Sequence, residues 1–174
     1  MKLFKDLSIQ EFIKNALTDI HFEKLTPVQE EVIPQALSGQ SLIVQSQTGS
    51  GKTHSFLVPI LNQINPNANE VQAVVTAPSR ELAEQLYNVA IQIASFSEKP
   101  IKVVRYIGGT DKQRQVEKLQ NNDQPQLVIG TPGRIFDLMS ENALWVQSTK
   151  TFVVDEADMT MDLGFLSTID EIAS

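Results

Sequence analysis

The sequence predicts an α/β fold built around a parallel sheet. Short β-branched runs alternate with longer amphipathic stretches along the 174 residues. Three of the short runs are almost wholly apolar, as is typical of parallel strands that are buried on both faces. A glycine-rich segment directly follows the first run. This rhythm predicts right-handed crossovers and a ligand site at the carboxyl ends of the strands.

Each expected element has its own sequence pattern. The apolar and β-branched runs predict strands at residues 41–44, 72–76, 101–104, 127–129 and 151–154. Apolar residues recur at helical spacing from Pro78 to Phe96, which predicts a helix there. Residues Asp111 to Gln120 form a shorter, charged helix candidate. Because neither a repeat nor a linker divides the chain, we expect one domain.

Composition excludes several classes of function. The 14 Lys and Arg against 21 Asp and Glu give a net charge of −7, which argues against a protein that coats nucleic acid through bulk positive potential. A few backbone amides and arginines can still hold a strand. The absence of cysteine excludes thiolate zinc sites and disulfides. Because no apolar run approaches the roughly 18 residues of a membrane span, we expect a cytoplasmic protein without membrane association.

The segment from Ser46 to Thr53 has the pattern of a phosphate-binding loop between a strand and a helix. Gly49 and Gly51 allow the backbone N–H groups to turn toward a phosphate, and the following helix adds its N-terminal dipole. Lys52 would reach the outer phosphates, and the Thr53 hydroxyl would bind Mg²⁺. The alternative is a glycine-rich turn that carries a chance lysine.

A second candidate site follows the last expected strand, where the sequence reads Asp-Glu-Ala-Asp from Asp155 to Asp158. Asp155 would hold Mg²⁺ through water, and Glu156 could orient or deprotonate the attacking water. These residues alone could instead form an acidic helix N-terminus. The phosphate loop upstream favours a nucleotide hydrolase, because each half-site supports the other.

Together these motifs resemble the first RecA-like domain of a DEAD-box ATP-dependent RNA helicase, most similar to bacterial cold-shock members. The Asp155–Asp158 segment resembles the motif that names the family, and Ser46 replaces the usual alanine of the phosphate loop. Further family motifs are matched by residues 78–83, 108–109 and 131–134. The resemblance implies a RecA-like three-layer fold that uses ATP and Mg²⁺.

The resemblance also implies which residues contact ATP. Gln29 would hydrogen-bond the adenine edge, and Phe4 would pack on the ring. The implied ATP-binding residues are Phe4, Phe22, Thr26, Gln29, Gln47, Thr48, Gly49, Ser50, Gly51, Lys52 and Thr53, and the implied catalytic residues are Lys52, Asp155 and Glu156. His21 and Leu25 depart from the family pattern, which usually has Gly and Pro there. Residues 26–29 also read as a capping box, and both roles can coexist.

The family binds the RNA backbone without reading sequence, which agrees with an acidic surface. The implied RNA-binding residues are Pro78, Arg80, Gly108, Gly109, Thr131 and Arg134. Read alone, Thr131 could simply cap a helix, and Arg80 could pair with a neighbouring carboxylate.

In the family, a strand ending in a Ser-Ala-Thr-like motif and a second RecA-like domain follow the helix that contains Leu163 to Phe165. Neither occurs in the sequence before Ser174. That strand would lie between the phosphate-loop strand and the Asp155 strand, so we expect a gap in the sheet of a truncated domain with little activity of its own. The alternatives are a non-hydrolysing ATP- or RNA-binding module and a phosphate-loop motor that acts on DNA.

Overall fold

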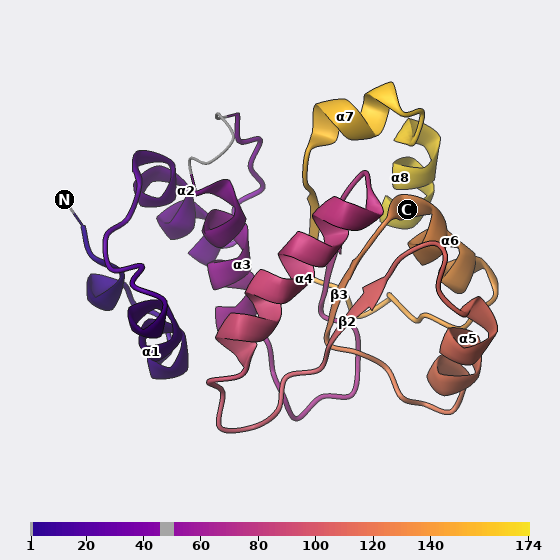
Figure 1. The fold of residues 1–174 in the computed structure, drawn as a ribbon, viewed down its shortest axis with the longest axis horizontal. Helices are drawn as coiled ribbons and strands as arrows, with labels where there is room; N and C mark the ends of the chain where they lie inside the picture. Colours follow the sequence, from indigo (N-terminus) through magenta and orange to yellow (C-terminus); the bar gives the residue numbers. More distant parts are fainter. Residues whose placement is uncertain (1, 46–50) are drawn as a thin grey trace. The chain divides into compact units, whose positions relative to one another are not determined.

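Strands and helices alternate through most of the chain, as Figure 1 shows. The computed structural model describes residues 2–45 and 51–174. The strands are β1 (Ala73–Thr76), β2 (Val103–Tyr106), β3 (Leu127–Gly130) and β4 (Thr151–Val154). The helices are η1 (Phe4–Asp6), α1 (Glu11–Asp19), α2 (Pro27–Leu37), α3 (Lys52–Gln63), α4 (Arg80–Ala94), α5 (Lys112–Gln120), α6 (Pro132–Ser140), α7 (Ala157–Asp162) and α8 (Leu166–Ala173).

The chain forms two compact units. The first unit comprises Met1–Ile64 and Ala90–Pro100, and the second comprises Asn65–Val89 and Ile101–Ser174. The first unit holds α1, α2 and α3, and the second holds all four strands of the described sheet. No helix in the described part of the chain is long and apolar enough to cross a membrane.

The sheet of the second unit is parallel, with the strand order β2-β3-β1-β4. Its register aligns the last residues of the strands, because Tyr106 pairs with Gly130, Gly130 with Thr76, and Thr76 with Val154. Every segment that follows a strand therefore begins at the same edge of the sheet. The prediction of a parallel α/β fold is confirmed.

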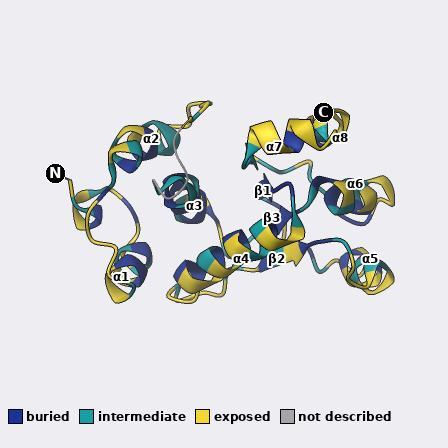
Figure 2. Ribbon diagram, turned by 45° about the horizontal axis from the view of Figure 1, so that its top comes forward, coloured by how far each residue is buried: buried dark blue, intermediate teal, exposed yellow. Residues whose placement is uncertain are grey.

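Helices cover both faces of this sheet. Val74 and Val128 belong to a buried cluster with residues of α5, α6 and α8. Side chains alternate between the two faces along a strand, so Arg105 points to the face opposite that of Val104, which packs against this cluster. The Arg105 guanidinium contacts Glu84 of α4 at 3.1 Å, which places α4 on the second face. The predicted three-layer arrangement is confirmed in this unit, and Figure 2 shows the buried strands β1 and β3 between more exposed helices.

One predicted strand is wrong. Residues 41–45 adopt no strand, and the side chain of Ile43 is fully exposed. An isolated strand is not stable, because its backbone groups need a hydrogen-bonded neighbour and its side chains need a face to pack against. Among the described residues no strand pairs with this segment, and β4 pairs with β1 alone. The other four predicted strands form, although β2 begins two residues later than the expected 101–104.

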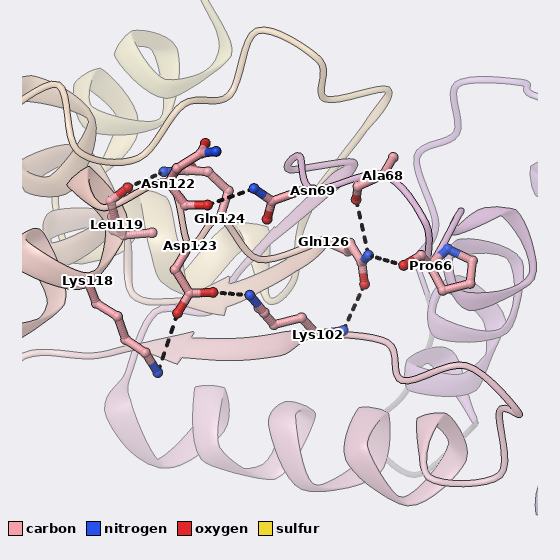
Figure 3. A network of polar contacts seen from close by, with 10 residues as sticks. All are labelled: Pro66, Ala68, Asn69, Lys102, Lys118, Leu119, Asn122, Asp123, Gln124 and Gln126. Carbon is pink, nitrogen blue, oxygen red and sulfur yellow. Dashed lines mark hydrogen bonds and ion pairs between the residues drawn. The ribbon is translucent and has the colours of Figure 1, made fainter.

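Two buried glutamines, Gln124 and Gln126, hydrogen-bond to the backbone of loops in the second unit (Figure 3). Gln124 donates through Nε2 to the carbonyls of Leu119 and Ala143, and its Oε1 accepts from the Trp145 N–H. Gln126 donates to the carbonyls of Pro66 and Ala68 and accepts from the Lys102 N–H. Such bonds satisfy backbone groups that loops would otherwise leave buried and unpaired.

The first unit is built from helices with local caps. α1 ends in a Schellman motif, in which the Phe22 N–H bonds to the Leu17 carbonyl and the His21 N–H to the Thr18 carbonyl. His21 occupies the left-handed position of this motif with φ = 63°, where glycine is the usual residue. This left-handed conformation gives a physical reason for the glycine that the family pattern usually has at this position.

Candidate functional site

The backbone ladder continues past the carboxyl ends of the strands and fixes the segments that follow. The Ala77 N–H bonds to the Gly130 carbonyl at 2.9 Å, and the Thr131 N–H to the Tyr106 carbonyl at 3.0 Å. The Asp155 N–H bonds to the Thr76 carbonyl at 2.9 Å. The structure thereby brings the predicted RNA-binding segments and the acidic motif to one edge of the sheet. Pro78 is buried behind this edge.

Arg80 and Gly109 lie against each other at this edge. Gly109 has φ = +83°, and a Cβ on it would lie 2.6 Å from Arg80 Nη1. A side chain at position 109 would therefore displace the guanidinium as well as strain the backbone. Arg80 is exposed and takes part in none of the ion pairs of the described residues. Its charge remains available to a ligand, and the alternative of a helical ion pair is not observed.

Thr131 occupies the N-cap position of α6, with Pro132 as the first helical residue. Its hydroxyl makes no capping hydrogen bond, so the side chain is not used to close the helix. The alternative reading of Thr131 as a helix cap is therefore correct for its position at the helix start, whereas its side chain makes no capping bond. The N-terminal N–H groups of α6 point toward the same edge as Gly108 and Gly109, where an anion is favoured.

Arg134 is half-buried on the first turn of α6, and its guanidinium bonds within the protein. Nη1 donates to Thr110 Oγ1 at 3.0 Å and to Gln115 Oε1 at 2.8 Å. Nη2 donates to the Thr110 carbonyl at 3.3 Å. Thr110 and Gln115 were not singled out in the sequence, because nothing in their local pattern indicates a contact with a residue about 20 positions away.

Asp155 and Glu156 follow β4 and are half-buried. Glu156 is the N-cap residue of α7 and has φ = 53°, a left-handed conformation that costs a non-glycine residue on the order of 1 kcal/mol. Its side chain makes no capping bond, and its carbonyl accepts the Thr160 N–H. The alternative of an acidic helix N-terminus is therefore partly correct, since Asp158 lies in the first turn of α7.

Gln29 joins the start of α2 to the start of α3 in the first unit. Its side chain is buried, with Oε1 accepting the Thr26 N–H at 2.9 Å and Nε2 donating to the Gly51 carbonyl at 3.1 Å. The Gln29 N–H bonds in turn to Thr26 Oγ1, which completes the predicted capping box. Gly51 has φ = +93°, and a Cβ on it would lie 2.4 Å from Gln29 Nε2. One amide thus performs the capping role and contacts the end of the phosphate-loop sequence.

The phosphate-loop residues are described only in part. Gly51 is the N-cap of α3, and Lys52 and Thr53 are its first two residues, both half-buried. The remaining predicted residues Ser46, Gln47, Thr48, Gly49 and Ser50 lie outside the described residues. The N–H groups at the start of this 12-residue helix are suited to bind phosphate.

Aromatic rings gather near this helix in the first unit. Phe4 is buried and lines a pocket of about 210 Å³ together with Phe22, Lys14 and Thr18. The Phe22 side chain is 46% exposed, and its ring centroid lies 4.7 Å from that of His54 on α3. Burial lowers the pKa of His54 below its usual value, so the ring is neutral at pH 7. Its Nε2 is buried without a hydrogen-bond partner, a feature that the sequence does not reveal.

The chemistry of Thr53 and Asp155 suits Mg²⁺, because both offer hard oxygen donors. Among the described residues, no three or more His, Cys, Asp or Glu side chains form a metal cluster. Mg²⁺ usually keeps several waters and takes few protein ligands beside the substrate phosphates, so a single oxygen donor in each unit is the kind of ligand that this ion uses.

Gly130 is a structural residue of this edge that the sequence analysis did not single out. A Cβ on it would lie 2.2 Å from the Tyr106 backbone oxygen and 3.2 Å from Ile135 Cδ1. The signal that could have indicated it is a glycine at the end of an otherwise apolar strand, which often marks a close backbone approach.

Comparison with known sequences identifies relatives across nearly the whole chain. Residues 26–174 match the family described as DEAD/DEAH box helicase. The chain is 54% identical to the DEAD-box ATP-dependent RNA helicase CshB of Listeria monocytogenes and 46% identical to CshB of Bacillus subtilis. In both cases 98% of this chain is covered, and the chain spans 39% of the relative.

Solved structures with the same fold are also similar in sequence. A DEAD box protein from Methanococcus jannaschii superposes with a TM-score of 0.88 at 35% identity, covering 98% of this chain and 46% of that one. A variant of Saccharomyces cerevisiae Dbp5 bound to RNA and ADP BeF3 gives a TM-score of 0.88 at 30% identity, covering 99% and 43%. The chain therefore belongs to the DEAD/DEAH box helicase family.

Proposed function

We propose that this chain is the ATP-binding half of an ATP-dependent RNA helicase. The observation that carries the proposal is the single sheet edge at which Arg80, Gly109 and Thr131 lie together with Asp155 and Glu156. RNA binding and ATP hydrolysis can be coupled through the strands, because the residues proposed for both lie at one edge of the sheet. The relatives named as RNA helicases and the RNA-bound structure of Dbp5 support the same function.

In this proposal the first unit binds ATP. The N-terminal N–H groups of α3 and the Lys52 ammonium would hold the phosphates, with Gln47, Thr48, Gly49, Ser50 and Gly51 forming the loop. Gln29 would contact the adenine edge with the amide hydrogen and lone pair that its two observed bonds leave free. Phe4, Phe22 and Thr26 would complete the base site.

Hydrolysis would depend on the acidic motif. Thr53 and Asp155 would hold Mg²⁺, which neutralises charge on the phosphates when bound. Glu156 would orient the attacking water and accept its proton. Its left-handed backbone fixes the side chain at the strand end without a capping bond that would occupy the carboxylate.

RNA would be held through its backbone. Arg80 would pair with a phosphate, and the Gly108, Gly109 and Thr131 amides would donate to phosphates and sugars, with Pro78 shaping the segment. Such contacts read no sequence. Because the chain spans 39% of its relatives, we further propose that a second RecA-like domain of the same cytoplasmic protein closes over both ligands.

The test compares Glu156→Gln with Glu171→Gln, a matched change at an exposed position of α8, in the complete protein. Glu156→Gln should lower RNA-stimulated ATP turnover by 10² or more, because the general base is lost. Binding of a fluorescent ATP analogue should stay within about twofold, since the carboxylate is not needed for binding. Turnover that survives the change would overturn the hydrolytic role.

Two other functions are decided by the same assay. A non-hydrolysing binding module would show no turnover in the unmodified protein, and a motor that acts on DNA would be stimulated more by single-stranded DNA than by RNA of equal length. Stimulation by RNA alone supports the helicase.

A further inference from the structure

The Thr110 hydroxyl is the centre of a closed hydrogen-bond network beside the predicted RNA site. It donates to the Ile107 carbonyl at 2.7 Å and accepts from Gln115 Nε2 at 3.1 Å and from Arg134 Nη1 at 3.0 Å. A hydroxyl has one hydrogen to donate and two lone pairs, so all of its capacity is used. Arg134 also donates to Gln115 Oε1 at 2.8 Å, which closes the network.

The network joins three elements that are separate in sequence. Thr110 ends the loop after β2, Gln115 lies on α5, and Arg134 lies on the first turn of α6. The Thr110–Ile107 bond spans Gly108 and Gly109, two consecutive glycines with more backbone freedom than other residue types. Fixing such residues on ligand binding is entropically costly, so a preformed turn binds more tightly than a mobile one.

Most of the donor capacity of Arg134 is used within the protein. Both hydrogens of Nη1 are used, and Nη2 donates to the Thr110 carbonyl, so three of the five N–H donors have internal acceptors. A phosphate at the Nη1 end of this guanidinium would have to displace these acceptors. Arg80, in contrast, is exposed and takes part in none of the ion pairs that the structure describes. The two arginines therefore differ in what they can do for an RNA strand.

We infer that Arg134 is a positioning residue, which with Thr110 and Gln115 holds the Gly108–Gly109 turn and the start of α6 in the geometry that grips the RNA backbone. It acts on RNA through these segments and does not pair with a phosphate. This inference rests on the proposed function of the chain, and it assigns roles to Thr110 and Gln115.

Salt dependence separates positioning from phosphate contact. The affinity of the complete protein for fluorescein-labelled oligo(U) is measured at KCl concentrations from about 50 to about 300 mM. The variants are Thr110→Val, Arg134→Gln and the double variant. Each single variant should bind about tenfold more weakly with the unchanged salt slope, and the double variant should bind no more weakly than either. A direct phosphate contact predicts instead that Arg134→Gln lowers the slope by about 0.7 and that Thr110→Val binds normally.

Conservative variants give an independent readout. Arg134→Lys keeps the charge but loses the planar fork, so positioning predicts no rescue, whereas a phosphate contact predicts near-normal binding. The matched control is Arg114→Gln, which removes an exposed charge from neighbouring α5 and should leave binding within about twofold. Arg80→Gln should lower the slope, which confirms that the assay detects a phosphate contact.

Hydrogen exchange tests the network without RNA. The amides of Gly108, Gly109 and Thr110 should exchange faster in Thr110→Val and Arg134→Gln, and at the normal rate in Arg114→Gln. Normal exchange in both network variants overturns the inference. If the unmodified protein binds no RNA, the proposed function fails. The exchange measurement then still shows whether Thr110 and Arg134 hold the Gly108–Gly109 turn. If Arg134→Gln does not fold, Thr110→Val and Gln115→Leu provide the same comparison.

Discussion

Two apolar segments that precede candidate nucleotide-binding residues differ in their neighbours. Residues 151–154 form β4, which is hydrogen-bonded along its length to β1 and ends directly before Asp155. Residues 41–45 precede the phosphate-loop sequence, pair with no strand among the described residues and leave Ile43 fully exposed. Both segments are rich in β-branched and apolar residues, so intrinsic strand preference is not what distinguishes them. A strand is stable where a partner satisfies its backbone groups and a helix covers its face.

The contrast extends to how each unit positions its functional residues. In the second unit, long-range pairing between parallel strands places Arg80, Thr131 and Asp155 at one edge. In the first unit, Gln29 and Gly51 are positioned by helix N-termini and a local capping box. The proposed RNA-binding residues and the acidic motif therefore depend on the sheet, whereas Gln29 and Gly51, which are proposed to bind nucleotide, depend on helix starts.

Hydrogen exchange should show the largest difference between the two segments. Amides of residues 41–45 should exchange at nearly the rate of an unfolded chain, because they have no strand partner. Amides of Val74 and Val75 in β1, paired on both sides, should be protected about 10³-fold or more. Mass spectrometry of peptic peptides measures both in one sample. Equal protection of the two segments would contradict the comparison.

Gly130→Ala should be the most damaging single change to the sheet. The new methyl group would collide with the Tyr106 backbone oxygen at 2.2 Å, which lies on a neighbouring strand and cannot move without breaking the ladder. We expect a loss of about 3 kcal/mol in the free energy of unfolding, measured by urea denaturation. Gly133→Ala is the matched control, because a Cβ there meets no atom within 4 Å, and it should cause no loss. Equal stability of the two variants would show that the strands can separate at this point.

Gln124→Ala should weaken the second unit by a smaller amount. It leaves the carbonyls of Leu119 and Ala143 and the Trp145 N–H without their partner in a buried region, at a cost of about 2 kcal/mol. Gln113→Ala removes an exposed glutamine from α5 and should change stability by less than about 0.5 kcal/mol. Thermal unfolding of both variants measures the difference. If the two variants unfold at the same temperature, water replaces the hydrogen bonds of the Gln124 amide.

Asp123→Asn should have the smallest effect, and the effect should depend on pH. The Asp123 carboxylate accepts a hydrogen bond from Lys102 and lies 3.7 Å from Lys118 Nζ, which holds its pKa below the ordinary value (Figure 3). A lowered pKa in the folded state means that the ion pairs stabilise the protein above about pH 4 and lose this effect as the pH falls through the folded pKa.

The expected loss in Asp123→Asn at pH 7 is about 0.5 kcal/mol, decreasing in high salt, because the pair is partly exposed. Urea unfolding at pH 7 and pH 3 should therefore show a larger difference from the unmodified chain at the higher pH. Asp137→Asn, at an exposed position without a described ion pair, is the control. A loss that is the same at both pH values would show that the ion pairs are not its cause.

Local patterns predicted most of the elements, and non-local contacts explain what they missed. The capping box at Thr26–Gln29 and the helix start at Thr131 follow from spacing within a few residues, so the sequence indicates them directly. The roles of Gln124 and Thr110 depend on partners about 20 residues away, which no local pattern specifies. The strand expected at residues 41–44 failed for the same reason, because pairing is a property of two segments.

Arg80 and Gly109 are 29 positions apart in sequence, yet the Arg80 guanidinium packs directly against Gly109. Any side chain at position 109 would collide with the Arg80 guanidinium, because its Cβ alone would lie 2.6 Å from Arg80 Nη1. In a saturation screen, every substitution of this glycine should then combine a strained backbone with a shifted Arg80 guanidinium. A phenotype at a residue that has no side chain would in this case report in part on the position of an arginine.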